Sequence, residues 1–255
     1  MVGGMTEMRV ETVTTYDGWY ALHDFRTMDW AKWAGASAKV KEQALSEFQS
    51  LLGSWQETAG AEEGSHAVYS IVGQKADLMF MLLRPTMKEL NKAELAFSKS
   101  LLGQYTKPNY SFVSIIEKSS YTKQYDNPYE DPEMRQKLFT QIPMDDYICF
   151  YPMSKLRGET YNWFQLPKED RGNLMFEHIE TAKPFTKEVK RIVTGAMGLD
   201  DYEWGVSLFC EDPLQFKKLI YDTRFDEVSA KYGIFGSFYI GYRIEQEDMA
   251  TYFEV

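Results

Sequence analysis

Apolar and polar positions along the chain follow two periods, and the change from one to the other marks the secondary structure. Runs with apolar residues at every second position predict strands, and runs with apolar residues at steps of three or four predict helices. Trp30, Trp33, Ala36 and Val40, for example, share one helical face. In the first half the pattern predicts a strand, a helix, two strands, a helix and a strand, at residues 19–25, 30–52, 67–72, 77–83, 87–102 and 110–116.

The same order of elements returns in the second half. The pattern predicts a strand, a helix, two strands, a helix and a strand, at residues 147–153, 168–183, 191–196, 202–210, 214–231 and 235–243. Between the two series, the polar segment 121–144 contains three prolines, and we interpret it as a connection.

Two βαββαβ series predict the α+β fold class, with two ferredoxin-like halves whose antiparallel sheets are each covered by helices on one face. The expected units are residues 1–120 and 147–255, joined by residues 121–146. The uncovered sheet faces must be buried, and packing one sheet against the other is the simplest solution. We expect a ligand site in the second half only, because the candidate residues described below begin at residue 121.

The amino-acid composition limits the classes of partner and the cellular location that we expect for this protein. The formal net charge of −10 disfavours nucleic acid or an anionic membrane as a general partner, so an anionic ligand needs a local basic pocket. Two cysteines, Cys149 and Cys210, are too few for a disulfide framework and favour a reducing, cytoplasmic location. The first residues lack the pattern of an export signal, and no apolar run is long enough to predict a membrane span.

The stretch ICFYPMSK, residues 148–155, begins as a core strand and ends with a phenol and an ammonium on one face. Strand alternation places Cys149, Tyr151, Met153 and Lys155 together on that face. A strand end whose lysine reaches water and whose tyrosine packs sideways would explain this pattern. A polar ligand held by Tyr151 and Lys155 would explain it as well.

His178 falls within the apolar stripe of the predicted helix 168–183. Such a histidine is most often a core residue bonded to a carbonyl, and the alternative is an axial metal ligand. No second histidine or cysteine stands at the spacing of a zinc site, and no phosphate loop or dinucleotide motif is present. Arg224 and Ser229 end another helix, where an ion pair of Arg224 with Asp226 or Glu227 on a solvated face is the ordinary interpretation.

Several longer motifs closely resemble the chlorite dismutase-like superfamily and, within it, the coproheme decarboxylases. They are DGWYALHDFR, YSIVGQKADLMF, YICFYPMSK, NWFQLP, RGNLMFEH, TGAMGLDDYEWGVSLF and LQFKKLIYDTRFDEVSAKYGIFGSFYIG. The resemblance covers residues 17–244. It implies a dimeric α+β barrel, iron-coproporphyrin III (coproheme) bound in the C-terminal half, a homopentameric ring, and contact with coproporphyrin ferrochelatase.

The resemblance also implies a reaction and a set of site residues. In such proteins, hydrogen peroxide drives conversion of two propionates of coproheme to vinyls, giving haem b in haem biosynthesis. A tyrosyl radical on Tyr151, with Lys155 beside it, acts on the propionate, and His178 is the proximal ligand of the iron. The remaining residues that the resemblance implies as contacts of the bound group are Tyr121, Lys137, Met153, Arg191, Arg224 and Ser229.

Two of these residues depart from the pattern of the decarboxylases. Lys137 stands where an arginine is usual, which keeps the charge and loses the bidentate fork. Arg191 stands where many decarboxylases have glutamine and chlorite dismutases have arginine, and a cation there could stabilise an oxyanion. Conversion of chlorite to chloride and dioxygen is therefore one alternative function, and a haem carrier or sensor without enzymatic activity is another.

Overall fold

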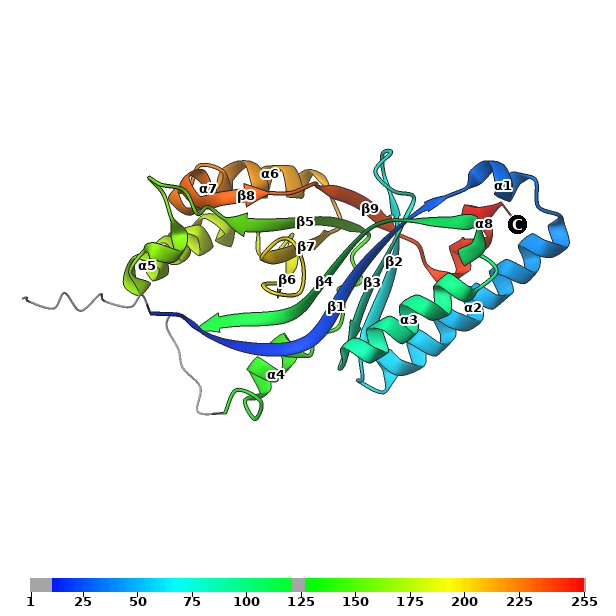
Figure 1. The fold of residues 1–255 in the computed structure, drawn as a ribbon, viewed down its shortest axis with the longest axis horizontal. Coiled ribbons are helices and arrows are strands. Elements are labelled where there is room, and N and C mark those ends of the chain that lie inside the picture. The colour runs from blue at the N-terminus through cyan, green and yellow to red at the C-terminus, as the bar shows by residue number, and fades with distance from the viewer. Residues whose placement is uncertain (1–10, 121–126, 255) are drawn as a thin grey trace, which may run out of the picture.

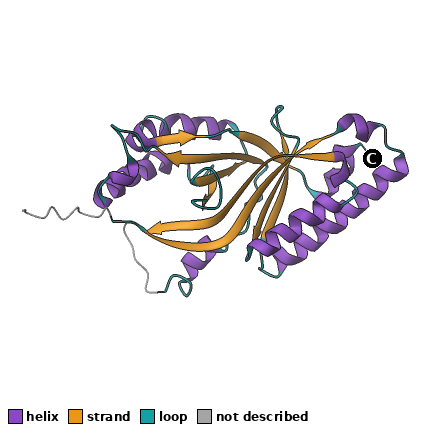
Figure 2. Cartoon of the chain, viewed as in Figure 1, coloured by secondary structure: helices purple, strands orange, loops and turns teal. Residues whose placement is uncertain are grey.

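The computed structural model describes residues 11–120 and 127–254, so Tyr121 lies outside the described residues. Figure 1 shows an elongated molecule with strands running through its middle and helices at both ends. The first half comprises β1 (Thr14–Met28), α1 (Trp30–Ala34), α2 (Ala38–Gly60), β2 (Ser65–Ile71), β3 (Leu78–Arg84), α3 (Met87–Lys99) and β4 (Thr106–Ser120). Helices α2 and α3 lie at the end opposite α5 (Figure 2).

The second half repeats this order with interruptions. Its elements are α4 (Pro132–Leu138), β5 (Tyr147–Lys155), α5 (Lys168–Ala182), β6 (Lys190–Gly195), β7 (Trp204–Cys210), α6 (Leu214–Thr223), α7 (Glu227–Tyr232), β8 (Gly233–Phe235), β9 (Tyr239–Arg243) and α8 (Met249–Phe253). No helix among the described residues has the length and apolar character to cross a membrane.

The strands form one antiparallel sheet in the order β7-β6-β4-β1-β3-β2-β9-β5-β8, and a further pairing of β5 with β7 closes it into a barrel. The first half contributes β4-β1-β3-β2, and the second contributes β6-β7-β5-β9 together with β8, which pairs with β5 on the same edge as β9. The halves meet where β4 pairs with β6 and where β2 pairs with β9. The predicted α+β class, with antiparallel sheets packed together, is confirmed. The edges of the two sheets also join, which the sequence pattern did not predict.

Capping residues explain where the structure departs from the predicted helices. The expected helix 30–52 is two helices, because Asp29 caps α1 and Ser37 caps α2, which then continues to Gly60. The expected helix 214–231 is interrupted after Thr223, and Asp226 caps α7 by accepting from the Ser229 amide. The expected strand 235–243 is likewise interrupted between β8 and β9. Helices α4 and α8 were not predicted.

The barrel interior is an apolar core that also contains a histidine. Phe25, Phe150 and Phe209 are fully buried there. His23 is 0% exposed, stacks on Phe150 with ring centroids 4.1 Å apart, and has its Nε2 2.8 Å from the Ser207 hydroxyl. Burial lowers the pKa of His23 to about 3, because the charged ring would have to leave water. The interior therefore requires a neutral imidazole.

This requirement predicts an acid sensitivity that His23→Gln should reduce. Below the usual histidine pKa of 6.5 the unfolded chain binds a proton that the folded chain does not bind until about pH 3. Stability is therefore lost as the pH falls through this window. Relative to the variant, the wild type should lose about 1.4 kcal/mol of unfolding free energy for each pH unit below 6.5. Urea unfolding between pH 7 and pH 4 measures this, and parallel curves for both proteins would contradict it.

Candidate functional site

Strand β5 separates the barrel core from the candidate site. Ile148 and Phe150 point into the barrel, whereas Cys149 and Tyr151 belong to a second apolar cluster together with Leu208 of β7. Both edges of β5 are paired, with β7 on one side and with β8 and β9 on the other. Because the backbone is held on both sides, the alternation of its side chains is fixed.

Tyr151 is a buried phenol with an aromatic neighbour and two cations in its surroundings. It is 7% exposed, and its ring stacks on Phe238 with centroids 4.4 Å apart. Burial raises the pKa of Tyr151, while the charges of Arg224 and Arg191 act in the opposite direction. The phenol is therefore neutral, with its proton in place, throughout the physiological pH range.

Lys155 is also buried, at the end of β5. Its backbone amide donates to the Glu203 carboxylate at 2.7 Å, and its ammonium lies 4.8 Å from the centre of the Trp163 ring. Burial lowers the pKa of Lys155 to about 8, and the charges of Asp226 and Glu203 partly offset this effect. A lysine with this pKa can exchange a proton near neutral pH.

His178 is held by a carboxylate from another helix. Its Nδ1 lies 2.7 Å from Oδ2 of Asp226, and the side chain of Asp226 is 1% exposed. Burial alone would raise the pKa of Asp226, but hydrogen bonds from His178 and from the Ser229 amide outweigh burial and lower it. An ionised Asp226 fixes the proton of His178 on Nδ1 and leaves Nε2 as a free lone pair. His178 is half-buried and bonded to a carboxylate, so it is not the core histidine bonded to a carbonyl that its spacing also allowed.

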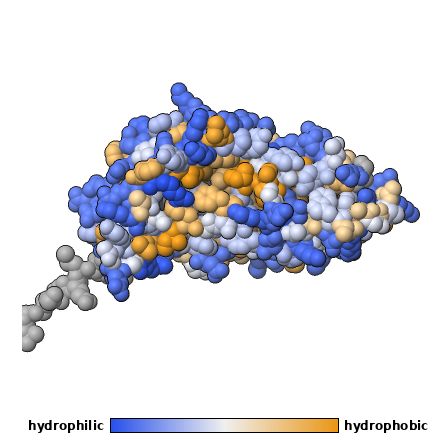
Figure 3. Space-filling model, turned by 90° about the horizontal axis from the view of Figure 1, so that it is seen from above, coloured by the Kyte–Doolittle hydropathy of each residue, from blue (hydrophilic) through white to orange (hydrophobic). Residues whose placement is uncertain are grey.

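The helix that carries His178 buries little of its apolar surface. Phe176 and Ile179 are 61% and 45% exposed, and the buried residues of α5 are Arg171 and Ala182. Further exposed apolar side chains in this half are Phe225 and Ile234. Figure 3 shows apolar atoms gathered on the surface of this part of the molecule. Exposed apolar surface of this extent commonly marks a binding site.

Arg224 and Ser229 lie on either side of Asp226, where α6 ends and α7 begins. The Arg224 guanidinium carbon is 3.4 Å from the centre of the Phe235 ring, and Ser229 donates its amide to Asp226 at 2.8 Å. Neither ion pair considered for Arg224 forms, because Asp226 binds His178 and Glu227 binds Lys231. Among the described residues Arg224 has no carboxylate partner, which leaves its guanidinium available to an anion.

Arg191 and Lys137 do not lie beside Tyr151 on β5. They line a hollow of about 240 Å³, where β4 and β6 separate under α4. Lys137 also pairs with Glu133 on α4. Met153 is half-buried in the same cluster as Tyr151 and pairs with Trp204 of β7. The structure thus gathers Tyr151 and Met153 on one sheet face, and it brings Arg191 and Lys137 together at that hollow.

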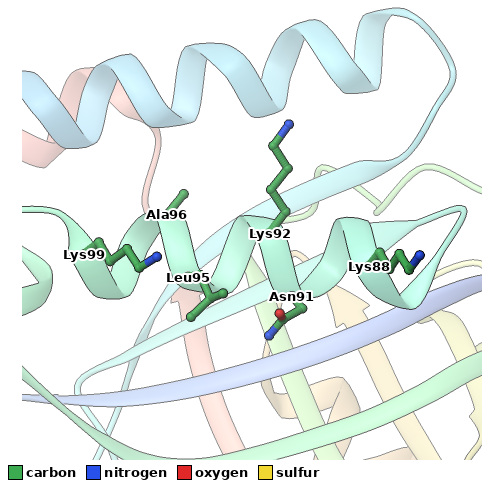
Figure 4. A pocket seen from close by; sticks show the side chains of 6 residues that line it. All are labelled: Lys88, Asn91, Lys92, Leu95, Ala96 and Lys99. Atoms are coloured by element: carbon green, nitrogen blue, oxygen red, sulfur yellow. The ribbon is translucent and has the colours of Figure 1, made fainter.

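A larger hollow, of about 440 Å³, lies on the outer flank of α3, far along the chain from these residues. Figure 4 shows that its lining comes from this one helix: Lys88, Asn91, Lys92, Leu95, Ala96 and Lys99. It contains no histidine, carboxylate or aromatic side chain. Despite its size, it lacks groups that could carry out proton transfer or bind a metal ion.

Sequence reasoning missed the residues that support the candidate site. Asp226, Trp163 and Glu203 are distant in the chain from the residues they hold, and no sequence spacing links them to His178 or Lys155. The one local signal was Asp226 three positions before Ser229, the pattern of a helix N-cap. Lys118, the third cation of the hollow beside Arg191, gave no signal, because a lysine near a strand end is common.

Known proteins place the chain in a family. The model of the chlorite dismutase family matches residues 41–244. The chain belongs to the chlorite dismutase family. This agrees with the superfamily that its motifs resemble, whereas the family model does not single out the decarboxylases.

Solved structures also resemble this family member over nearly its whole length, and two of them illustrate the range of similarity. One is a novel haem-binding protein from Thermus thermophilus, with 42% identity and a TM-score of 0.94; the match covers 97% of this chain and 99% of that one. The other is a mutant of the chlorite dismutase from Candidatus Nitrospira defluvii, with 21% identity and a TM-score of 0.75, covering 94% and 96% of the two chains. At 21% identity the second likeness shows the fold alone.

For this chlorite dismutase family member, the lowered pKa of Lys155 predicts a pH-dependent effect of Lys155→Met. Between pH 8 and 10.5 the unfolded chain keeps a proton on this lysine that the folded chain has lost, so the wild type gains stability as the pH rises. The stability of the variant relative to wild type should therefore fall by about 3 kcal/mol across this window.

Chemical unfolding at pH 7.5 and at pH 10.5 measures this difference. Lys107→Met, which changes an exposed lysine on β4, serves as the control and should show little pH-dependent difference. If Lys155→Met behaves like the control, Lys155 is not a desolvated ammonium.

Proposed function

We propose that this protein is a coproheme decarboxylase, which uses hydrogen peroxide to convert two propionates of iron-coproporphyrin III to vinyls and so forms haem b. The observation that carries the proposal is the buried phenol of Tyr151, on the same strand as the buried ammonium of Lys155. A protein that only binds haem, or one that decomposes chlorite, has no need of a redox-active phenol there. With this function we propose a cytoplasmic homopentamer that has transient contact with coproporphyrin ferrochelatase.

The residues present fit an iron tetrapyrrole. His178 has Nδ1 bonded to Asp226, which is the usual arrangement for a histidine that ligates a metal through Nε2. A lone histidine suits a metal whose other ligands come from a macrocycle. The exposed apolar side chains of α5 suit the flat ring. The guanidinium of Arg224 and the hydroxyl of Ser229 suit the carboxylates.

The reaction places definite demands on the residues of the chain. Each propionate, with one hydrogen peroxide and one proton, gives a vinyl group, carbon dioxide and two waters. When bound, the iron supplies the redox chemistry that passes two electrons per propionate to the peroxide. Tyr151, once oxidised, takes one hydrogen atom from the propionate carbon next to the ring, and the second electron leaves as carbon dioxide is lost. Lys155, with its pKa of about 8, holds the carboxylate or supplies a proton.

The direct test is product analysis by mass spectrometry. The purified apoprotein is mixed with iron-coproporphyrin III, hydrogen peroxide is added stepwise, and the masses of the tetrapyrroles are followed. The proposal expects stepwise loss of two carboxyl groups as carbon dioxide, ending at haem b. Binding without conversion would contradict the enzymatic proposal and favour a carrier or sensor.

Tyr151→Phe should separate binding from chemistry. The variant should bind iron-coproporphyrin III with an affinity within about tenfold of wild type, because one neutral hydrogen bond contributes only about 0.5–1.5 kcal/mol. Conversion should nevertheless stop before the first vinyl forms, since phenylalanine has no O–H to oxidise. The same mass assay, with a binding titration beside it, measures both effects.

Tyr147→Phe is the matched control, because Tyr147 lies on the same strand and the same face. It should convert like wild type. If Tyr151→Phe converts the substrate fully, the phenol of Tyr151 only anchors the propionate and takes no part in the oxidation.

His178→Ala should remove the histidine-ligated spectrum of the bound iron while the far-ultraviolet circular dichroism stays unchanged. The expectation follows from Nε2, which the bond between Nδ1 and Asp226 leaves free. Added imidazole should restore part of the spectrum. His66→Gln, a change on β2, is the control. An unaltered spectrum in His178→Ala would rule out this histidine as the iron ligand.

Chlorite decomposition is the second candidate function, and the observation that favours it is Arg191. Arg191 is exposed on β6 and has no carboxylate partner among the described residues. A guanidinium free in this way could stabilise an oxyanion bound at the iron. The test is dioxygen release from chlorite. If the protein releases dioxygen at a rate that matches decarboxylation, and Arg191→Gln loses this activity, chlorite decomposition would be favoured over decarboxylation.

A further inference from the structure

The hollow between β4 and β6 forms where two strands of the barrel separate. Their pairing consists of Ile115 with Gly195 and Ile116 with Thr194, and the hollow opens just beyond it. Ile116 and Ile192 form its apolar floor, and Gln136 and Thr140 line it from α4 and the turn after it. At about 240 Å³ it is smaller than the roughly 300–1,000 Å³ usual for sites that enclose a whole ligand. It therefore suits one arm of a larger molecule or a small ion.

Three cations converge on this hollow. Lys118 reaches it from β4, Lys137 from α4 and Arg191 from β6. Lys137 pairs with Glu133, whereas among the described residues neither Lys118 nor Arg191 has an ion-pair partner. Among the described residues Glu117, the neighbour of Lys118 on β4, forms no ion pair with these cations, and its carboxylate accepts a hydrogen bond from Trp204. The hollow is thus a local excess of positive charge in a protein of net charge −10.

This arrangement is unfavourable in the absence of an anion. Burial lowers the pKa of Lys118, and the charges of Arg191 and Lys137 lower it further. Like charges held close together repel one another, and an anion between them reverses the sign of the interaction. A group with two anionic oxygens and a small volume, such as a carboxylate, matches both the charge and the size.

Arg191 connects the hollow to the strand that carries Tyr151. Arg191 pairs with Leu208, which pairs in turn with Cys149, two residues before Tyr151. Strand spacing then puts the Cα atoms of Arg191 and Tyr151 about 12 Å apart. The charge of Arg191 affects the pKa values of both Lys118 and Tyr151. A flat macrocycle lying beside Tyr151 could therefore extend a carboxylate arm into the hollow.

We propose that Lys118, together with Lys137 and Arg191, forms an anion site that holds one carboxylate of the tetrapyrrole substrate, with Lys118 as a positioning residue. This rests on the proposed function for the identity of the ligand. Because β4 belongs to the first half of the chain, the substrate would then be held by residues of both halves, not by the second half alone.

The test compares the wild type with Lys118→Gln, Lys118→Arg and Lys107→Gln. Iron-coproporphyrin III is titrated into each apoprotein, and the melting temperature of each apoprotein is measured. Lys118→Gln should weaken binding by about tenfold or more, the effect of losing a charge-assisted hydrogen bond. Lys118→Arg should restore most of the affinity. Lys107→Gln, which changes an exposed lysine at the other end of β4, should bind like wild type.

The melting temperature separates this site from a purely structural role. Removing one of three repelling cations should leave the Lys118→Gln apoprotein at least as stable as wild type, although it binds less tightly. A clear loss of stability together with unchanged affinity would overturn the proposal. Inorganic phosphate serves as a probe for a free oxyanion. If phosphate stabilises the wild type and not Lys118→Gln, while affinity for the tetrapyrrole is equal in both, the substrate assignment is overturned.

The outcomes also separate this proposal from the proposed function. Weaker tetrapyrrole binding by Lys118→Gln, in a protein whose wild type makes no vinyl groups, would leave the anion site standing and reject the decarboxylase. If the wild type converts the substrate normally and Lys118→Gln binds it equally well, the decarboxylase would stand and the anion site would be rejected.

Discussion

The double pairing of β5 is the constraint on which the rest of the structure depends. Hydrogen bonds to β7 on one edge and to β8 and β9 on the other close the sheet into a barrel. A strand held on both edges cannot shift its register without moving every side chain to the opposite face. Phe150 is therefore committed to the core, and Tyr151 is committed to the opposite face, under the helices.

A single carboxylate organises the helical side of the site. Asp226 caps α7, so it determines where the second of two short helices begins, and it also binds His178 of α5. The cap holds the carboxylate in place, and the carboxylate holds the imidazole. The break between α6 and α7 also puts Arg224 and Ser229 on either side of it. The interruption of a helix that the sequence pattern predicted as continuous is thus what brings these groups together.

Cations without carboxylate partners distinguish the site from the rest of this acidic protein. Arg224 lies against the Phe235 ring, and Arg191 and Lys118 lie at the hollow beyond β6, each without a carboxylate partner among the described residues. Unpaired cations at two separate positions suit a ligand with several carboxylates. The charges of Arg224 and Arg191 both act on Tyr151, which is neutral and packed on Phe238. In this environment burial raises the pKa of the phenol, so Tyr151 keeps its proton at physiological pH.

The sequence by itself determined the repeated βαββαβ order of the main strands and helices, the α+β class and the face of β5 on which Tyr151 and Lys155 lie. These follow from periodicity, which is local and is imposed by backbone geometry. Its motifs also identified the superfamily and drew attention to His178 and Arg224. The closure of the barrel, the bond from His178 to Asp226 and the convergence of Lys118 with Arg191 were decided only by the tertiary structure. Each joins residues far apart in the chain, and whether such residues meet depends on how the strands pair and how the helices pack, which no local pattern encodes.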